Sequence, residues 1–370
     1  MPRTGNSEIQ MVDLRTQYDR MKSEIDAAIQ RVLDDTSFIK GPELDAFENA
    51  LGERLGAHVV GVANGTDALQ IALMALGLQP GDEVINPSFT FVATAEAASL
   101  LGAVPVFADI EPDRFTMDPA RIEELITPRT RAIVPVHLFG QCADMDAIMA
   151  ISEKHGIPVV EDTAQAIGSD WNGHPAGTRG AFGTLSFFPS KNLGCYGDGG
   201  GVVSKSDELI ERARLIANHG SRKKYHNEVV GVNSRLDALQ AAILDVKLRH
   251  LDEYTERRRA AADIYDRLLS GIPGVTIPVR SPHSLHVFHQ YTIRIGRGRD
   301  DVQRKLDEAG IPSAVYYPVP LHRLPVYVDT PPRQALEETE KAAAEVLSLP
   351  MHTELTLDMQ ERIAACIGAA

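Results

Sequence analysis

The chain has 370 residues and a formal net charge of −14, from 37 lysines and arginines against 51 aspartates and glutamates. This charge argues against DNA or RNA as a partner, because the protein offers no net positive field to a phosphate backbone. A hydrophobic content of 44% and a charged content of 24% are typical of a globular protein and exclude a disordered one. At about 150 residues per domain, the length predicts about two domains.

The three cysteines, Cys142, Cys195 and Cys366, lie far apart in the sequence. An odd number without paired spacing argues against both a disulfide framework and a zinc site. The histidines show no HxxxH or HExxH spacing, so we expect no metal. Residues 1–8 are polar and unlike a signal peptide, and no run of 18 apolar residues occurs. We therefore expect a cytoplasmic protein that does not span a membrane.

Short apolar runs alternate with helical patterns from about residue 20 to residue 210. The runs cover residues 58–62, 83–86, 104–109, 131–137, 157–162, 184–188 and 201–204. Most are continuously apolar, which is typical of strands covered on both faces. The intervening helical patterns include residues 66–76, 94–101 and 145–155. This alternation predicts an α/β fold with a mostly parallel mixed sheet between layers of helices.

The last third of the chain has a different pattern. Residues 236–269 predict one long helix that bridges two domains, and a smaller α+β domain is expected beyond it, with a strand at 290–295, a helix at 299–309 and a final helix. We place the division after residue 250. The large domain, 1–250, would begin with an N-terminal helical segment, and the small domain would cover 251–370.

A single lysine, Lys191, follows an apolar strand pattern and precedes a turn with four glycines in residues 197–201. Most lysines are solvated surface charges, but one at the end of a buried strand beside glycine-rich backbone can be desolvated. Such a lysine loses its proton more readily and can form a Schiff base with a carbonyl compound. Enzymes that use pyridoxal phosphate (PLP) need this lysine and an acidic partner for the ring nitrogen.

Two carboxylates, Glu161 and Asp162, end a strongly apolar strand pattern. Ligands of open α/β sheets bind beyond the carboxyl ends of strands. Because successive side chains of a strand face opposite sides, at most one of the two is expected to enter a given site. Both could instead cap the following helix. Together with Lys191, an ionised carboxylate that keeps the ring nitrogen protonated is the favoured interpretation.

A polar turn at residues 64–67 follows a strand and opens a helix, where free amides and the helix dipole favour an anion. Asn64 or Thr66 could equally be a simple N-cap. It is neither a Walker loop nor a dinucleotide fingerprint. Nearby, Phe89 or Phe91 could stack on a flat cofactor ring, or both could belong to the core.

A helix start at residues 231–240 contains Asn233 and Arg235. Arginine is suited to bidentate recognition of a carboxylate or a phosphate. An ordinary surface helix start is the alternative.

In this order, these elements resemble the nucleotide-sugar aminotransferases of the DegT family, which are fold-type I PLP enzymes. The motifs that carry the resemblance lie at residues 64–69, 80–85, 90–94, 162–166, 186–193, 199–201, 218–220, 231–237, 317–322 and 347–352. Single motifs are weak signals, but the ordered set covers nearly the whole chain. The resemblance implies a homodimer whose active sites are built from two subunits, with small-molecule substrates as its other partners.

The resemblance also implies a role for each matching residue. Lys191 would form the Schiff base with PLP and transfer protons, and Asp162 would pair with the ring nitrogen. The other implied cofactor contacts are Gln165 on the phenolic oxygen, Phe91 against the ring, and Ser186, the amides of Gly65, Thr66 and Asp67, and Asn233 of the neighbouring subunit at the phosphate. Contacts to the sugar or the amino donor are implied for Arg235, Tyr316, Tyr317 and His322. Position 316 often carries histidine in this family.

The reaction implied by the resemblance has two halves. Glutamate gives its amine to the cofactor and leaves as 2-oxoglutarate, and a keto-sugar then takes the amine. Residues 139–144 and 193–200 are similar to the branch that aminates C3 of UDP-2-acetamido-2-deoxy-3-oxo-glucuronic acid for cell-surface polysaccharide synthesis. A dTDP-linked or GDP-linked keto-sugar aminated at C3 or C4 stays open, as does a non-catalytic regulator on a PLP-enzyme scaffold. A related group of sugar dehydratases carries histidine in place of Lys191.

Overall fold

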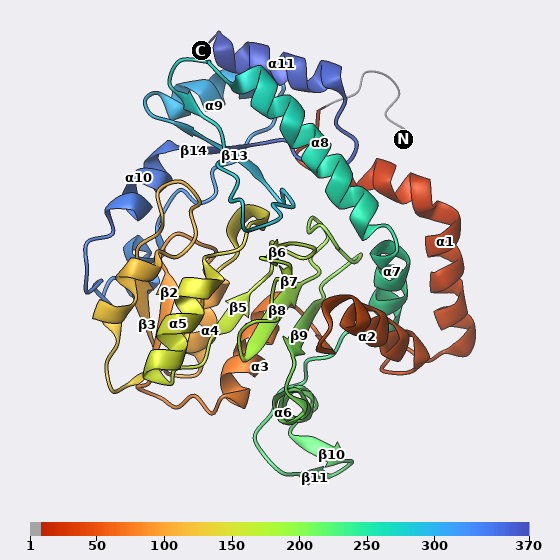
Figure 1. Cartoon of the computed structure of the whole chain (residues 1–370). Helices are drawn as coiled ribbons and strands as arrows, with labels where there is room; N and C mark the ends of the chain where they lie inside the picture. The colour runs from red at the N-terminus through yellow and green to blue at the C-terminus, as the bar shows by residue number, and fades with distance from the viewer. Residues whose placement is uncertain (1–8, 370) are drawn as a thin grey trace.

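The computed structural model describes residues 9–369 (Figure 1). The polar start at residues 1–8, where no signal peptide is expected, lies outside the described residues. Within residues 9–369 no helix is both long and apolar enough to cross a membrane. No cluster of three or more His, Cys, Asp or Glu side chains in the same range is arranged to hold a metal ion. The three cysteines are free thiols.

Two hydrogen-bonded ladders form the central layer, in the orders β3-β2-β4 and β1-β9-β8-β5. Parallel bridges from Ile133 to Val159 and from Val136 to Asp162 join them. The strands are β1 (His58–Val62), β2 (Glu83–Pro87), β3 (Val104–Ala108), β4 (Thr130–Ile133), β5 (Val160–Asp162), β8 (Phe182–Ser186) and β9 (Gly200–Ser204). Strand β9 is antiparallel to β1 and β8, whereas the other pairs are parallel. The predicted mostly parallel mixed sheet is confirmed.

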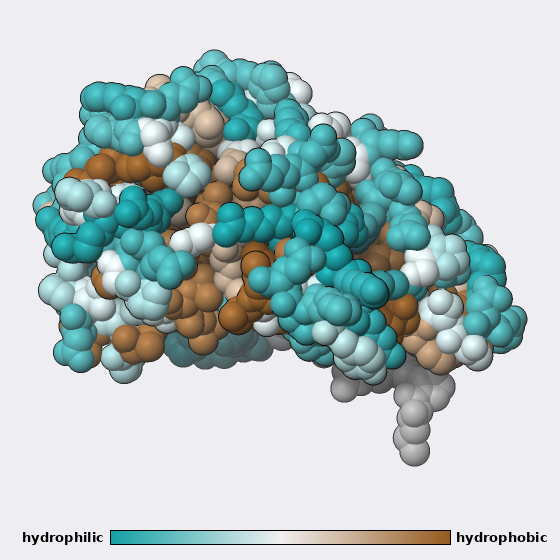
Figure 2. Space-filling model, turned by 90° about the horizontal axis from the view of Figure 1, so that it is seen from below, coloured by the Kyte–Doolittle hydropathy of each residue, from teal (hydrophilic) through white to brown (hydrophobic). Residues whose placement is uncertain are grey.

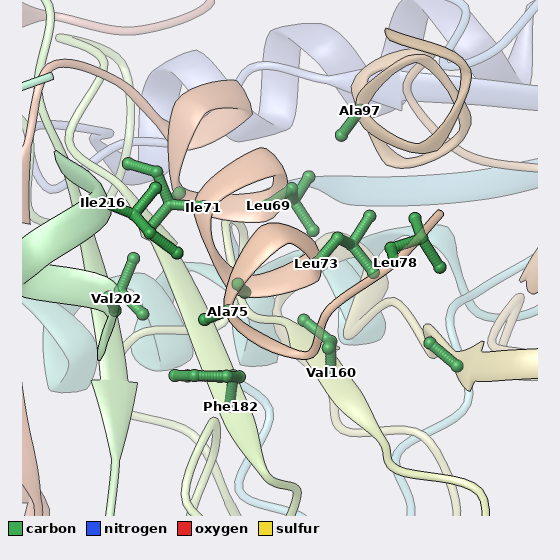
Figure 3. Packing of buried hydrophobic residues seen from close by; sticks show 14 of the residues in the cluster. Leu69, Ile71, Leu73, Ala75, Leu78, Ala97, Val160, Phe182, Val202 and Ile216 are labelled. Carbon is green, nitrogen blue, oxygen red and sulfur yellow. The ribbon is translucent and has the colours of Figure 1, made fainter. Parts of the chain in front are cut away.

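Helices cover this sheet, as the alternating pattern predicts (Figure 1). They include α3 (Gly65–Ala75), α4 (Ala93–Leu100), α5 (Met145–His155) and α6 (Asp207–Ala217). Helix α3 packs on the sheet, with Leu73 and Ala75 fully buried near Val160 of β5 and Phe182 of β8 (Figure 3). Each leucine buried in this way contributes about 1.5–3 kcal/mol. This packing holds the N-terminus of α3 at the carboxyl ends of the strands.

The single long helix expected over residues 236–269 is two helices, α7 (Ala238–Leu248) and α8 (Leu251–Leu269). The amide of His250 bonds the Lys247 carbonyl at 3.0 Å, and the His250 carbonyl accepts the bond that starts α8. Helix α7 packs against α1 (Leu14–Asp35) and α2 (Pro42–Leu55), whereas α8 packs against α11 (Leu357–Gly368). One straight helix cannot bury its apolar face against both groups, and this explains the break.

A second, smaller core surrounds an antiparallel sheet of three strands in the order β12-β13-β14. The strands are β12 (Val275–Thr276), β13 (Tyr291–Ile295) and β14 (Val346–Leu349), and the neighbouring helices are α9 (Arg299–Glu308), α10 (Glu337–Glu345) and α11. Tyr265 of α8 and Tyr291 of β13 are fully buried in this core. The predicted strand and helices of the last third are thus present, while the division after residue 250 stays a prediction.

Two short hairpins complete the fold, β6–β7 (Asp170–Trp171 and His174–Pro175) and β10–β11 (Ser221–Lys223 and His226–Asn227). The β10–β11 hairpin projects beside α6 at the bottom of Figure 1. Residues 222–230 are all exposed, including Tyr225 and Val230 at 86% each. Seen from below, the surface is mostly hydrophilic, with hydrophobic residues gathered toward the middle (Figure 2).

Candidate active site

A cavity of about 740 Å³ opens at the carboxyl edge of the central sheet, where β1, β5 and β8 end. This is where open α/β sheets place their ligands. Most of the predicted site residues line it: Gly65, Thr66, Phe91, Asp162, Gln165, Ser186, Lys191, Tyr316 and Tyr317. The lining comes from both halves of the chain, because the segment 315–318 and residues 289–290 close one side. The residues that the sequence motifs single out therefore meet in one place.

Lys191 lies in the loop between β8 and β9, with its side chain in the cavity wall. Burial lowers the pKa of its amine from 10.5 to about 8, and the negative charge of Asp162 opposes the shift. The loop is anchored on both sides of the lysine. Asn192 donates to the Val287 carbonyl at 3.0 Å, and the buried Lys247 amine donates to the Gly194 carbonyl.

The two carboxylates at the end of β5 separate as the alternation of strand side chains predicts. Asp162 faces the cavity, where it accepts a hydrogen bond from the Thr94 hydroxyl at 2.7 Å. Glu161 is buried on the other face against His137, at 2.9 Å, and accepts bonds from the amides of Gly177 and Gly180. Burial alone would raise the Glu161 pKa, but these bonds lower it below its usual value. Asp162 is thus the site carboxylate, and Glu161 ties the end of the strand to the loop before β8.

The start of α3 lines the cavity with backbone groups that suit an anion. Asn64 is the N-cap, because its side chain accepts a bond from the Asp67 amide at 2.8 Å. The amides of Gly65 and Thr66, in the first turn, have no intrahelical acceptor and line the cavity. Ser186 lies directly beside them, since a Cβ atom on Gly65 would stand 2.8 Å from the Ser186 Cβ. Two of the three predicted amides are therefore open, and that of Asp67 is capped.

The aromatic side chains near the cavity fall into two groups. Phe89 is fully buried and packs against Phe115 and Phe139, so it belongs to the core. Phe91 is 55% exposed and lines the cavity, which leaves one face of its ring free for a ligand. Phe91, and not Phe89, is therefore the ring that a ligand in the cavity can reach.

Gln165 connects the cavity to the segment 315–318. Its amide nitrogen donates to the Tyr317 hydroxyl at 3.0 Å, and its oxygen accepts from the Phe139 amide at 2.8 Å. Burial raises the pKa of Tyr317 well above its usual value, so its hydroxyl stays protonated at neutral pH. The second hydrogen of the Gln165 amide is left for a ligand oxygen.

Besides Asp67, three predicted residues do not line the cavity of their own chain. His322 has both ring nitrogens engaged, one with Ser88 and one with Glu340, each at 2.8 Å. Asn233 is exposed, and Arg235 has no hydrogen bond or ion pair with any residue in 9–369. Asn233 and Arg235 precede α7 and do not line the cavity.

Sequence reasoning did not assign a role to several residues that the structure places in or beside the site. Thr94 holds Asp162, Asp198 lines the cavity beside Lys191, and His289 enters from just before β13. Thr94 lies in the motif at residues 90–94 and Asp198 in the glycine-rich turn at 197–201, so the sequence could have indicated both as site residues. His289 had none, because its place depends on how the two cores meet.

The arrangement fits PLP. The close contact between Gly65 and Ser186 forms a cradle that a Cβ atom on Gly65 would fill, and the helix amides there suit a phosphate. Asp162, held ready by Thr94, suits a protonated ring nitrogen, and the lowered pKa of Lys191 suits an amine that reacts with a carbonyl.

Comparison with known proteins agrees with this geometry. Residues 19–368 match the profile of the DegT/DnrJ/EryC1/StrS aminotransferase family. The chain is 49% identical over 97% of its length to a pleiotropic regulatory protein of Geobacillus stearothermophilus, covering 98% of that protein. It is 49% identical over 94% of its length to the UDP-2-acetamido-2-deoxy-3-oxo-D-glucuronate aminotransferase of Pseudomonas aeruginosa, covering 96%. It is 48% identical to the UDP-N-acetyl-3-dehydro-α-D-glucosamine 3-aminotransferase of Acidithiobacillus ferrooxidans, covering 98% of each chain.

Solved structures give the same result. The chain is similar to DesV of Streptomyces venezuelae in complex with a ketimine intermediate, with a TM-score of 0.95, 44% identity and 98% coverage of both chains. It is also similar to NtdA of Bacillus subtilis with bound cofactor PMP, with a TM-score of 0.91 and 35% identity, over 98% of this chain and 85% of that one.

The lowered pKa of Lys191 predicts that this residue destabilises the cofactor-free protein. Replacing Lys191 by Met should stabilise it at pH 7 by roughly 1–3 kcal/mol, because the folded state no longer holds a charged amine with a lowered pKa. The unfolded chain binds the extra proton between about pH 8 and 10.5, so wild-type stability should rise through that window and the difference should shrink. Urea unfolding at about pH 7 and pH 10 measures both free energies. An equal difference at the two pH values would contradict the lowered pKa.

A second prediction concerns the anion cradle. Gly65→Ala should weaken PLP binding about tenfold or more, because the new Cβ atom must push Ser186 away from the phosphate position. Gly296→Ala is the matched control, since a Cβ atom there meets nothing within 4 Å. Equilibrium titration of the apo proteins with PLP gives both affinities. Equal affinities for the two variants would show that the phosphate does not bind beside Gly65.

Proposed function

Because the chain belongs to the DegT/DnrJ/EryC1/StrS aminotransferase family, we propose that it transfers the amino group of L-glutamate to C3 of UDP-2-acetamido-2-deoxy-3-oxo-glucuronic acid. The enzyme class is a PLP-dependent sugar aminotransferase. The donor, the sugar and the carbon atom are the proposed part. The product would serve cell-surface polysaccharide synthesis in the cytoplasm.

One observation carries the choice of acceptor. Two relatives at 48–49% identity are named for UDP-linked sugars that share an acetylated amine at C2 and a keto group at C3. They differ in whether the sugar is a glucuronate or a glucosamine. The shared chemistry supports a UDP-linked 3-keto sugar. Arg235, which is half-buried and has no hydrogen bond or ion pair within residues 9–369, supports the sugar that carries a carboxylate.

The charge of the cavity supports a site completed by a second subunit. Within residues 9–369 the lining has one amine, Lys191, and two carboxylates, Asp162 and Asp198. A diphosphate with a uronic acid is strongly anionic, so it needs cations that this wall does not offer. Arg235 and the exposed basic hairpin residues 222–224 do not line the cavity of their own chain. A homodimer that brings these residues to the partner's cavity would supply the missing charge.

The residues of the cavity divide the work of the transfer. PLP, when bound, supplies an electron sink at the substrate carbon. The Lys191 amine, with a pKa of about 8, both accepts and returns a proton near neutral pH. Asp162 keeps the ring nitrogen protonated, and Thr94 orients its carboxylate. Phe91 and Gln165 would hold the flat ring, while Ser186 and the start of α3 would hold its phosphate.

A regulatory role is the second candidate, because one relative at 49% identity is named a pleiotropic regulatory protein. A pure regulator has no use for a lysine of lowered pKa and a hydrogen-bonded carboxylate in the lining of one cavity of about 740 Å³. The intact set of Lys191, Asp162 and Gln165 therefore favours catalysis.

The donor half of the reaction is directly measurable. The purified protein should carry the visible absorbance band of bound PLP, and L-glutamate should bleach it, while L-aspartate as the control should bleach it far more slowly. Lys191→Ala should not turn over repeatedly. A band that ignores glutamate would point to another donor, and the absence of a band after PLP is added would favour the regulator.

The acceptor half then identifies the sugar. UDP-2-acetamido-2-deoxy-3-oxo-glucuronic acid should restore the band of the glutamate-treated enzyme more efficiently than the 3-keto glucosamine analogue or dTDP-linked and GDP-linked keto-sugars. Preference for one of those other sugars would replace the proposed acceptor while leaving the enzyme class in place.

Mixed dimers test the shared site. Lys191→Ala and Arg235→Ala should each be inactive on the keto-uronate, yet their mixture, after subunit exchange, should recover up to about a quarter of wild-type activity. Half of the dimers would be mixed, and each mixed dimer would pair one intact Lys191 with an intact Arg235 of the other subunit. Full activity of Arg235→Ala alone would show that Arg235 has no role in the active site. No recovery on mixing would place it in the site of its own chain.

A further inference from the structure

The segment before β13, residues 286–290, is held by hydrogen bonds from several distant parts of the chain. The Val287 amide donates to the Gly140 carbonyl at 2.8 Å, and Asn192, next to Lys191, donates to the Val287 carbonyl. The fully buried guanidinium of Arg258 donates to the Phe288 carbonyl at 3.0 Å and lies 3.4 Å from that of His289.

Phe288 is strained within this segment. Its φ of +46° lies in the left-handed region, which costs a non-glycine residue roughly 1–3 kcal/mol. Such strain persists only where the surroundings over-determine the backbone, and it concentrates at functional sites. The residue that this arrangement aims at the cavity is the next one, His289.

The His289 side chain is 7% exposed and lines the cavity, yet it has no hydrogen bond within residues 9–369. Its Nδ1 atom is fully enclosed without a partner. Nε2 is not enclosed, so it faces the cavity that the residue lines. Burying an N–H group without an acceptor is rarer and more costly than burying a bare lone pair. The proton therefore belongs on Nε2, where it can be donated to a ligand.

The ring is also uncharged. Burial lowers the pKa of His289 well below 6.5, and the positive charges of Lys191 and Arg258 lower it further. The cavity thus has a neutral, immobile hydrogen-bond donor near its reactive lysine.

We propose that the Nε2–H of His289 binds an uncharged oxygen of the acceptor sugar, a hydroxyl or carbonyl next to the reacting carbon, and so helps to select that sugar. This inference rests on the proposed function for its acceptor. The carboxylates of an amino-acid donor call for cations, whereas sugar hydroxyl and carbonyl oxygens are suited to a neutral donor. His289 should therefore matter in one half of the reaction and not in the other.

The test compares both half-reactions of the holoenzyme in three variants. His289→Phe removes the donor, and His289→Gln keeps an amide N–H at about the Nε2 position. His352→Gln is the matched control, since His352 is also buried near Arg258 with an unpartnered nitrogen but does not line the cavity. The absorbance band of bound PLP is followed in both half-reactions. L-glutamate removes the band, and a panel of UDP-, dTDP- and GDP-linked 3- and 4-keto sugars is tested for its return.

With glutamate, all three variants should react within about twofold of wild type, which also shows that they fold. With the sugar that wild type prefers, His289→Phe should need about 10- to 100-fold more sugar for half-saturation, because one sugar oxygen loses its partner. His289→Gln and His352→Gln should stay within about threefold.

Unchanged sugar saturation in His289→Phe would overturn the inference, and so would an equal loss in both half-reactions. If wild type prefers a sugar other than the keto-uronate, the proposed acceptor fails, and the His289 comparison is made with the preferred sugar. If wild type takes amine from glutamate but passes it to no sugar of the panel, both proposals are overturned.

Discussion

An amine kept close to neutrality beside a buried carboxylate is the interaction on which the rest of this structure depends. Burial lowers the pKa of Lys191 to about 8, and the charge of Asp162 limits the fall. This balance is stable only if neither group can move, because a small displacement changes both the burial and the attraction. Thr94 fixes the carboxylate, and Asn192 and Lys247 fix the loop that carries the amine. The two hydrophobic cores therefore converge on a few side chains.

Adjacent residues on β5 divide two tasks that conflict chemically. Asp162 has to stay available to a ligand. Among residues 9–369 its carboxylate accepts a bond from one side chain, that of Thr94, and a local bond from the Ala164 amide. Glu161 has to hold the chain together, so it is enclosed by His137 and backbone amides. Because successive side chains of a β-strand point to opposite faces, two adjacent carboxylates reach different surroundings. In the sequence the two residues look like a single acidic motif, although only one of them faces the cavity.

What could be predicted from the sequence follows the range of the interactions involved. Lys191 and Asp162 stand at the ends of strands, and strand ends are visible in local apolar patterns. The choice between Phe89 and Phe91 was open on the residues alone, because it depends on which ring meets Phe115 and Phe139. The break between α7 and α8 was missed because the helical pattern continues through it, and only packing against different partners separates the helices.

His289 marks the limit of sequence reasoning most clearly. Burial lowers its pKa most, and Lys191 and Arg258, which lie 98 and 31 positions earlier in the chain, lower it further. Its backbone position depends on the bonds of Val287 to Asn192 and Gly140. None of these relations is local.

The net negative lining of the cavity gives phosphate binding and sugar recognition different requirements. The start of α3 can hold a phosphate within one chain, whereas recognition of an anionic sugar needs charge from outside it. In the proposed homodimer, dissociation into single subunits would therefore weaken sugar binding more than cofactor binding, which would lose only the predicted contact of Asn233 with the phosphate.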